Sequence, residues 1–216
     1  LYSWVPDAVR EAIMALCARH LAPQGVAFIS YNTYPGCHVR NIVRDMLRYH
    51  VHNAPDAETK ISQSRALLKF MADAQPEGDE YGQMLRKELE RVLTHAPAHL
   101  FHDDLSEDNH PIYFHQFEQH AQAHGLQFLS EAEYFMMQAD QFPEATIQQL
   151  ASLGDNISAR QQYLDFLRCR RFRQSLICRA DVAVDHQILP QRLTEVFVTF
   201  CGKSNDEAAD LATTEP

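Results

Sequence analysis

The stretch Gly25 to Gly36, with the sequence GVAFISYNTYPG, decides the fold of this chain. Its apolar residues show little period-2 alternation and are rich in β-branched and aromatic side chains, which is typical of a strand buried on both faces. Tyr34-Pro35-Gly36 then ends the run with turn-forming residues. We therefore predict a central parallel strand here, followed by a turn and a helix.

A helix precedes this strand. Pro6 stands at its start, Asp7 lies in its first turn, and apolar residues recur at helical spacing up to Leu21. A helix, a short loop and a buried strand form the second half of a βαβ unit, which needs a parallel partner strand. We expect that partner, with the rest of an α/β domain, upstream of Leu1.

Composition excludes several classes of protein. The net charge of −10 disfavours nonspecific binding to nucleic acid, whose phosphates prefer basic surfaces. No window approaches the roughly 20 uninterrupted apolar residues of a membrane span. The five cysteines are scattered and form no Cys-x-x-Cys pair, so we expect no disulfide framework and a cytoplasmic location.

The pattern after Gly36 changes to amphipathic helices, at about 38–52, 57–74 and 79–95. Consecutive amphipathic helices with short loops indicate a small bundle. An acidic loop follows, and the α/β pattern then returns. The segments predicted there are a helix at 114–124, a strand at 126–134 with one solvated face, helices at 144–153 and 158–170, and a strand at 172–179.

Four parts follow from this order. Residues 1–38 belong to an α/β core, 39–112 form an inserted helical domain, 113–180 supply the closing helix and strand pair with a helical insertion, and 181–216 form a linker and tail. The polar tail after Lys203 is expected to be disordered.

Four segments of the chain carry a specific resemblance. They are YSWVPDAVREAI, SYNTYPGCHVRNIVRDMLRYH, PIYFHQFEQHAQAHGLQFLSEAEY and QYLDFLRCRRFRQSLICR. In order and spacing the chain resembles the C-terminal part of bacterial class I S-adenosylmethionine-dependent methyltransferases that carry a methyltransferase regulatory domain, a group similar to the rickettsial protein-lysine methyltransferases. The resemblance covers roughly Tyr2 to Cys178.

The resemblance implies an α/β fold class, with the last three strands of a Rossmann-like sheet and an inserted helical bundle. The final strand would lie antiparallel between the other two. It implies S-adenosyl-L-methionine as the cofactor, bound by a Gly-rich loop and an acidic residue that this chain lacks, because its seven glycines are isolated. We therefore expect the cofactor site upstream of Leu1, weak or no cofactor binding by this segment alone, and no assignable catalytic residue.

Candidate substrate-positioning residues follow from the position of the strand end. Ligands of open α/β sheets bind beyond the carboxyl ends of the parallel strands, where Asn32 and Tyr34 lie. Methyl transfer to an amine needs a neutral, desolvated nucleophile, which aromatic and carbonyl groups can arrange. We predict Tyr2, Trp4, Asn32 and Tyr34 in this role, with a simple turn at Asn32 and Tyr34 and a packing role for Trp4 as the alternatives.

The twelve histidines suggest two candidate metal clusters. His95, His99 and His102 are closely spaced, and His120 and His124 are four residues apart on one predicted helix. No HExxH or paired-cysteine signature accompanies them. We therefore favour solvated or capping histidines and predict no metal site.

The charged runs have two interpretations each. We favour a solvated helix end for Arg168 to Arg173, with binding of an acidic partner as the alternative. We favour a solvated loop for Asp103 to Asp108, with an acidic rim that attracts a lysine-bearing substrate as the alternative. Cys37 follows the strand at a predicted helix start, where its pKa is expected to be lowered.

Three functions remain open at this level. The first is part of a methyltransferase with protein lysine as the candidate acceptor, in which the bundle acts as a lid or regulatory element, binds a protein substrate, or forms a homodimer. The second is a non-catalytic interaction module, and a metal-dependent hydrolase is a distant third. The free edge of the first strand is also expected to be prone to association.

Overall fold

A computed structural model describes residues 1–94, 96–154, 156–187, 191 and 194. Leu1–Ala183 form one compact unit, to which the following paragraphs are confined. The predicted disordered tail after Lys203 lies outside the described residues, as do His95 and Cys201. No helix within the described residues is long and apolar enough to cross a membrane.

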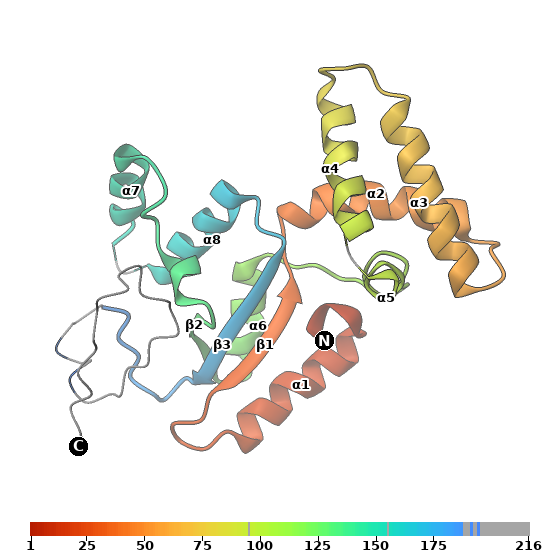
Figure 1. Cartoon of the computed structure of the whole chain (residues 1–216). Helices are drawn as coiled ribbons and strands as arrows, with labels where there is room; N and C mark the ends of the chain where they lie inside the picture. The colour runs from red at the N-terminus through yellow and green to blue at the C-terminus, as the bar shows by residue number, and fades with distance from the viewer. Residues whose placement is uncertain (95, 155, 188–190, 192–193, 195–216) are drawn as a thin grey trace, which may run out of the picture. The chain divides into compact units, whose positions relative to one another are not determined.

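The described residues contain one three-stranded sheet. Its strands are β1 (Ala27–Asn32), β2 (Leu126–Glu131) and β3 (Phe172–Arg179), in the order β1-β3-β2 (Figure 1). β3 is antiparallel to both neighbours, so β1 and β2 run in the same direction. The predicted arrangement, with the last strand antiparallel between the other two, is confirmed. Within the described residues the outer edge of β1 carries one bridge, from Thr33 to Ile112.

Helices cover one face of this sheet. They are α1 (Asp7–His20), α6 (Phe114–Ala123) and α8 (Ile157–Arg168). Tyr31 and Ile177 alternate onto the covered face and pack with Met14 of α1 and Phe117 of α6. The rings of Tyr31 and Phe117 are stacked with their centroids 4.3 Å apart. These contacts make the apolar core of the α/β part.

The opposite face of the sheet is exposed at two phenylalanines. Phe28 of β1 is 55% exposed and Phe172 of β3 is 41% exposed, and the described apolar clusters include neither of them. The prediction that the first strand is buried on both faces is therefore wrong for the described chain. An apolar side chain is buried only where another element packs against it, and the described helices pack against the other face.

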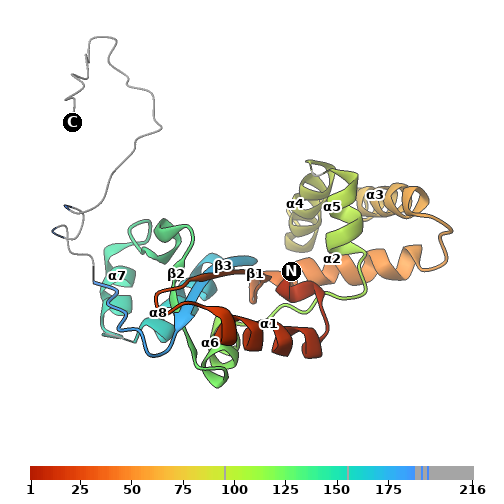
Figure 2. The same cartoon turned by 90° about the horizontal axis from the view of Figure 1, so that it is seen from below.

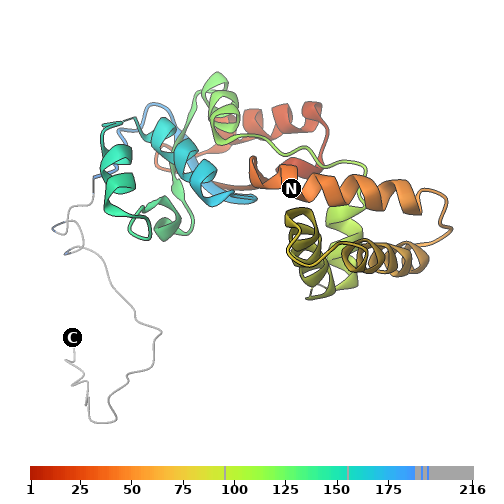
Figure 3. The same ribbon diagram turned by 90° about the horizontal axis from the view of Figure 1, so that it is seen from above.

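Three helices form the predicted bundle. They are α2 (Gly36–Val51), α3 (Ala57–Asp73) and α4 (Glu80–Thr94), and their bounds match the prediction to within two residues. α3 and α4 lie side by side, and both contact α2 (Figures 2 and 3). Leu47, Leu68 and Leu85, one from each helix, are fully buried together. The carboxylate of Asp56 caps α3 by accepting a hydrogen bond from the Thr59 amide at 2.8 Å.

The remaining elements are short. They are the 3₁₀ turns η1 (Tyr2–Trp4) and η3 (Tyr134–Met137), the helices α5 (Pro97–His99) and α7 (Glu144–Ala151), and the π-helical turn η2 (Leu100–Asp104). Two segments of the chain differ from the prediction. The strand predicted at 126–134 ends at Glu131, after a bulge between Phe128 and Ser130. The π-helical turn η2 extends into the acidic run as far as Asp104, and its first residue, Leu100, is buried in the core of the bundle.

Gly36 allows the bundle to join the sheet. Its amide donates a hydrogen bond of 2.9 Å to the carbonyl of Arg170, in the loop that precedes β3. A Cβ atom at this position would lie 2.2 Å from the carbonyl oxygen of Cys169. Two backbones therefore meet here at a distance that only glycine permits. The preceding Tyr34–Pro35 peptide bond is cis.

Candidate functional site

The carboxyl end of β1 is tied to two distant segments of the chain. The Asn32 amide nitrogen donates to Ser3 Oγ at 2.7 Å, and Asn32 Nδ2 donates to Asn109 Oδ1 at 2.8 Å. The Ile112 amide donates to the Asn32 carbonyl at 3.2 Å. Asn32 is buried, so its side chain positions the loop at Asn109 at the strand end.

Tyr2 and Trp4 lie on the same N-terminal turn in different surroundings. Tyr2 is buried in the core of the α/β part, where its ring contacts Tyr31 and Phe117 edge to face. Burial raises the pKa of its hydroxyl to about 12, which keeps the group neutral at physiological pH. Trp4 is half-buried, and its ring centroid lies 5.4 Å from that of His102. The sequence-predicted site residues thus surround one strand end without forming a single pocket.

Tyr34 belongs to an aromatic group at the surface. Its ring stacks on His38 with centroids 4.0 Å apart and lies 5.3 Å from the ring of Tyr113. His38 Nε2 is 3.2 Å from the Tyr113 hydroxyl. Burial raises the pKa of Tyr34, so its hydroxyl remains protonated. We call Tyr34, His38 and Tyr113 the aromatic patch; it presents aromatic rings and two hydroxyl groups at the end of β1.

Cys37 is not an activated thiol. It is fully buried, and its Sγ donates to the carbonyl of Arg171 at 3.2 Å. Burial raises the pKa of Cys37 to about 11, and the nearby Arg40 only partly opposes this effect. The prediction of a lowered pKa is therefore wrong, because loss of hydration outweighs the charge effect of the helix start.

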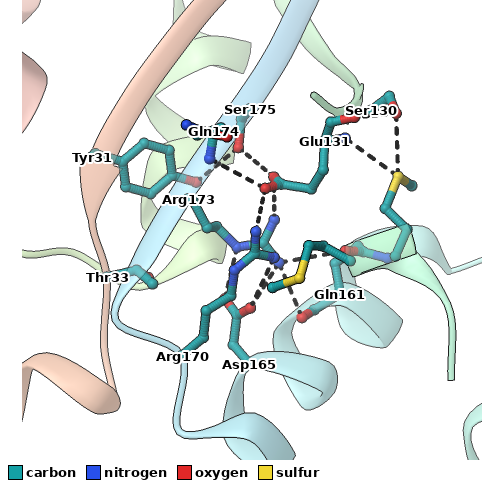
Figure 4. A network of polar contacts seen from close by, with 12 residues as sticks. Tyr31, Thr33, Ser130, Glu131, Gln161, Asp165, Arg170, Arg173, Gln174 and Ser175 are labelled. Carbon is teal, nitrogen blue, oxygen red and sulfur yellow. Dashed lines mark hydrogen bonds and ion pairs between the residues drawn. The ribbon is translucent and has the colours of Figure 1, made fainter. Parts of the chain in front are cut away.

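A buried network of charges joins β2, β3 and α8 (Figure 4). Arg173 is fully buried, with Nη1 2.6 Å from Glu131 Oε1 and Nε 2.8 Å from Asp165 Oδ2. Arg170 Nη2 lies 2.5 Å from Glu131 Oε2, and Ser175 Oγ donates to Glu131 Oε1 at 2.7 Å. Burial raises the pKa of Asp165 despite the adjacent guanidinium group of Arg173.

This network corrects the interpretation of the arginine run. Arg170 and Arg173 are buried and ion-paired, and Arg168 donates to the carbonyls of Met136 and Gln138. The prediction of a solvated helix end is therefore wrong, because Arg170 and Arg173 bind carboxylates of this chain. The sequence held one signal for the burial of Arg173: in a strand it lies on the same face as Ser175 and Ile177.

A second network links the bundle to the loop before β3. Asp104 Oδ1 accepts from Arg40 Nε at 2.8 Å and from Arg91 Nη2 at 3.1 Å. Glu88 accepts from Arg91 Nε at 2.9 Å, and its other oxygen lies 2.6 Å from Arg171 Nη2. The side chain of Asp104 is 3% exposed, so the interpretation of the whole acidic run as a solvated loop is wrong at this residue.

His95 of the first candidate cluster lies outside the described residues, so that cluster stays untested. His102 Nδ1 lies 2.8 Å from Asp103 Oδ1, and His99 is exposed. His120 and His124, by contrast, both approach Glu11 of α1. Glu11 was missed because nothing in the sequence relates α1 to α6, which are brought together only by packing on the sheet.

Comparisons with known proteins identify relatives of this chain. Residues 96–179 match the family model described as a predicted methyltransferase regulatory domain. An uncharacterised protein of Rickettsia prowazekii is 36% identical over 187 residues, which are 86% of this chain and 34% of the relative. A second uncharacterised protein of that organism is 38% identical over 123 residues, 56% of this chain and 49% of the relative.

A solved structure resembles the chain in fold as well as sequence. The structure of PKMT2 from Rickettsia typhi in complex with AdoHcy superimposes with a TM-score of 0.80 and 32% identity, over 89% of this chain and 36% of that chain. The resemblance to methyltransferases with a regulatory domain is thus confirmed. The chain spans between a third and half of the length of these relatives.

The family match begins later than the predicted insertion. It runs from 96 to 179, from α5 to the end of β3, whereas we predicted the inserted domain at residues 39–112. The match therefore includes the closing helix and strand pair, and the boundaries of the inserted domain stay a prediction.

Proposed function

We propose that this chain is part of an S-adenosylmethionine-dependent methyltransferase with protein lysine as its acceptor. The observation that carries the proposal is the similarity, at 32% identity over nearly the whole chain, to a structure bound to AdoHcy. A non-catalytic interaction module is the competing hypothesis. We further propose that the protein works in the cytoplasm, in keeping with the free cysteines among the described residues.

The sheet supports a role as part of a larger domain. The face opposite the helices carries the exposed Phe28 and Phe172, and the outer edge of β1 has one bridge among the described residues. An exposed apolar face and an unpaired edge are both costly in water. Further strands of a methyltransferase sheet would pair with the edge, and the helices that connect them would cover the face.

The described residues do not by themselves fit S-adenosylmethionine. The seven glycines of the chain are isolated and form no Gly-rich loop for the cofactor, and the buried carboxylates Asp104, Glu131 and Asp165 are already paired with arginines. Asn32 donates its side-chain amide to Asn109. We therefore assign cofactor binding to a part of the protein outside this chain and derive no catalytic step here.

The aromatic patch suits the acceptor side of the reaction. A lysine side chain has an apolar stem and an amine that must be neutral and desolvated before it attacks. Ring faces pack on the stem and favour a methylated ammonium product. We propose that Tyr34, His38 and Tyr113 contact the acceptor lysine, while Asn32 and Tyr2 hold the strand end in place.

The bundle has a fixed connection to the sheet, which supports a regulatory role. Glu88 of α4 pairs with Arg171 of the loop before β3, and Gly36 bonds to the same loop. A ligand or second subunit that displaced α4 would therefore pull on the loop beside the end of β1. We propose that a protein substrate or a homodimer partner binds the bundle and acts through this connection.

Cofactor binding tests the proposal. S-adenosylmethionine is titrated by calorimetry into this chain and into a chain extended upstream of Leu1. Micromolar binding by the extended chain, together with methyl-lysine detected in an acceptor protein by mass spectrometry, would support the enzyme. If neither chain binds, the methyltransferase proposal fails and the interaction module replaces it.

A pair of tyrosine variants tests the aromatic patch. Tyr34→Ala should raise KM for the acceptor protein about tenfold or more, because it removes a ring that packs on the lysine stem, and should leave cofactor affinity unchanged. Tyr49→Ala is the matched control, since Tyr49 also stacks on a histidine, His52, and is 81% exposed. Equal KM values for the two variants would exclude the patch from the acceptor site.

A further inference from the structure

Three side chains from two helices converge on one point of the α/β part. Glu11 comes from α1, His120 from the last turn of α6, and His124 caps the C-terminus of α6. Glu11 Oε1 lies 3.1 Å from His120 Nε2, and Glu11 Oε2 lies 2.9 Å from His124 Nε2. One ligand atom from each of the three lies within 4.8 Å of the others.

The two imidazoles are arranged around the carboxylate and do not stack on each other. Their ring planes are inclined at 74°, with centroids 5.2 Å apart. The i,i+4 spacing places both rings on one face of α6. Each Nε2 atom lies beside a different oxygen of the same carboxylate, and the three groups surround one position.

Tyr2 fixes the orientation of His120. Its hydroxyl lies 2.5 Å from His120 Nδ1, on the core side of the ring. This contact turns Nε2 toward Glu11. Metal-binding histidines characteristically use one ring nitrogen for the ion and the other for such a hydrogen bond.

The contact between His120 and Glu11 is close but not aligned as a hydrogen bond. His120 Nε2 is buried and has no hydrogen-bond partner among the described residues. A buried polar atom without a partner carries a cost that a bound ligand would remove. The atom lies beside the carboxylate at 3.1 Å without an aligned hydrogen bond, and a shared ion would lie between the two groups.

We propose that Glu11, His120 and His124 bind a divalent transition-metal ion of the zinc class. Two imidazole nitrogens and one carboxylate oxygen form a ligand set suited to zinc, and water would complete the coordination. Magnesium and calcium prefer oxygen ligands, so the two imidazoles disfavour them. The ion would clamp α1 to α6, both of which pack on the covered face of the sheet. This inference does not depend on the proposed methyltransferase function.

Metal titration of the purified full-length protein tests the site. After removal of metals with a chelator, zinc chloride is titrated by calorimetry, and cobalt(II) is added separately to follow its visible absorption. We expect one ion per chain at micromolar affinity, a tetrahedral cobalt spectrum and a rise in Tm with zinc. No saturable binding at one equivalent would overturn the proposal.

Variants locate the ion on these residues. His124→Ala and Glu11→Gln, both partly exposed, should weaken zinc binding about tenfold or more, and Tyr2→Phe should weaken it about tenfold through the orientation of His120. His20→Ala is the matched control, because it removes an exposed imidazole from the same helix as Glu11.

Three results would contradict the assignment. The first is zinc affinity that His124→Ala and Glu11→Gln both leave unchanged. The second is an equal loss of affinity in His20→Ala. A cobalt spectrum that is retained in His124→Ala would likewise show that the ion lies elsewhere, and that Glu11 and the histidines form ion pairs only.

Discussion

Replacement of Arg173 by methionine should be among the most destabilising single changes in the chain. Arg173→Met keeps an unbranched side chain of similar length, so the main loss is the guanidinium group. The network then holds two buried carboxylates, Glu131 and Asp165, against one guanidinium, that of Arg170. Removing one partner of a buried ion pair costs about 3 to 5 kcal/mol, and we expect a loss in that range.

The geometry places most of this cost at Asp165. Glu131 keeps Arg170, the hydroxyl of Ser175 and the amide of Gln174 as donors. Asp165 keeps only a contact of 3.7 Å with Arg170 within the network. The double variant Arg173→Met/Asp165→Leu should therefore recover part of the loss, because the uncompensated carboxylate is gone.

Urea unfolding followed by circular dichroism measures the effect. Arg179→Met is the matched control: Arg179 lies on the same strand and pairs with Asp181 at 3.0 Å, but the two side chains are 38% and 65% exposed. Exposed pairs contribute at most about 1 kcal/mol. If Arg173→Met costs no more than Arg179→Met, the argument that this network stabilises the fold is refuted.

The loss should also depend on pH. Burial raises the pKa of Asp165 in the folded protein. Protonation of Asp165 therefore stabilises the fold fully at pH values below its pKa in the unfolded chain, and this contribution disappears as pH rises through its pKa in the folded protein. Arg173 lowers that pKa, so Arg173→Met raises it further. The destabilisation should shrink as pH falls from about 7 to about 5, and a difference independent of pH would contradict this assignment.

Two further changes test the junction between β1 and α2. Cys37 is buried and its pKa is raised to about 11, so a thiol reagent should modify the exposed Cys169 in the native protein and leave Cys37 intact until unfolding. Rapid native labelling of Cys37, mapped by mass spectrometry, would contradict its burial. Gly36→Ala should lower the free energy of unfolding by about 3 kcal/mol or more, through the clash with the Cys169 carbonyl. Gly78→Ala is the control: the added Cβ meets open space, but the φ of +84° should still cost about 1 kcal/mol. Equal losses of unfolding free energy for the two variants in urea would rule out the close contact between Gly36 and the Cys169 carbonyl.

Local patterns predicted the elements of the fold well. Periodicity, proline and glycine positions placed the three bundle helices to within two residues, and the resemblance supplied the order β1-β3-β2. The errors lie where a nonlocal contact overrides a local pattern. Phe28 is apolar but exposed, and Asp104 is acidic but buried, because neither residue determines what packs against it.

The candidate site was only partly predictable. Strand-end reasoning selected Asn32 and Tyr34, and the structure places both at the end of β1, but it shows Tyr2 in the core. His38 lies four residues after Tyr34 and was overlooked, whereas Tyr113 had no sequence signal, since it reaches Tyr34 only when the loop before α6 returns to β1. The role of these residues in acceptor binding stays a prediction.

The sequence by itself determined the secondary structure, the acidic character and the methyltransferase resemblance, because these depend on residues that are neighbours along the chain or on motifs of fixed spacing. Only the tertiary structure decided which polar side chains meet: Arg173 with Asp165 and Glu131, and Glu11 with His120 and His124. Glu11 is separated from His120 by 109 positions and from His124 by 113 positions along the chain. Ion pairing and metal binding act over a few ångströms in space, and packing of helices on a sheet alone brings such residues within that range.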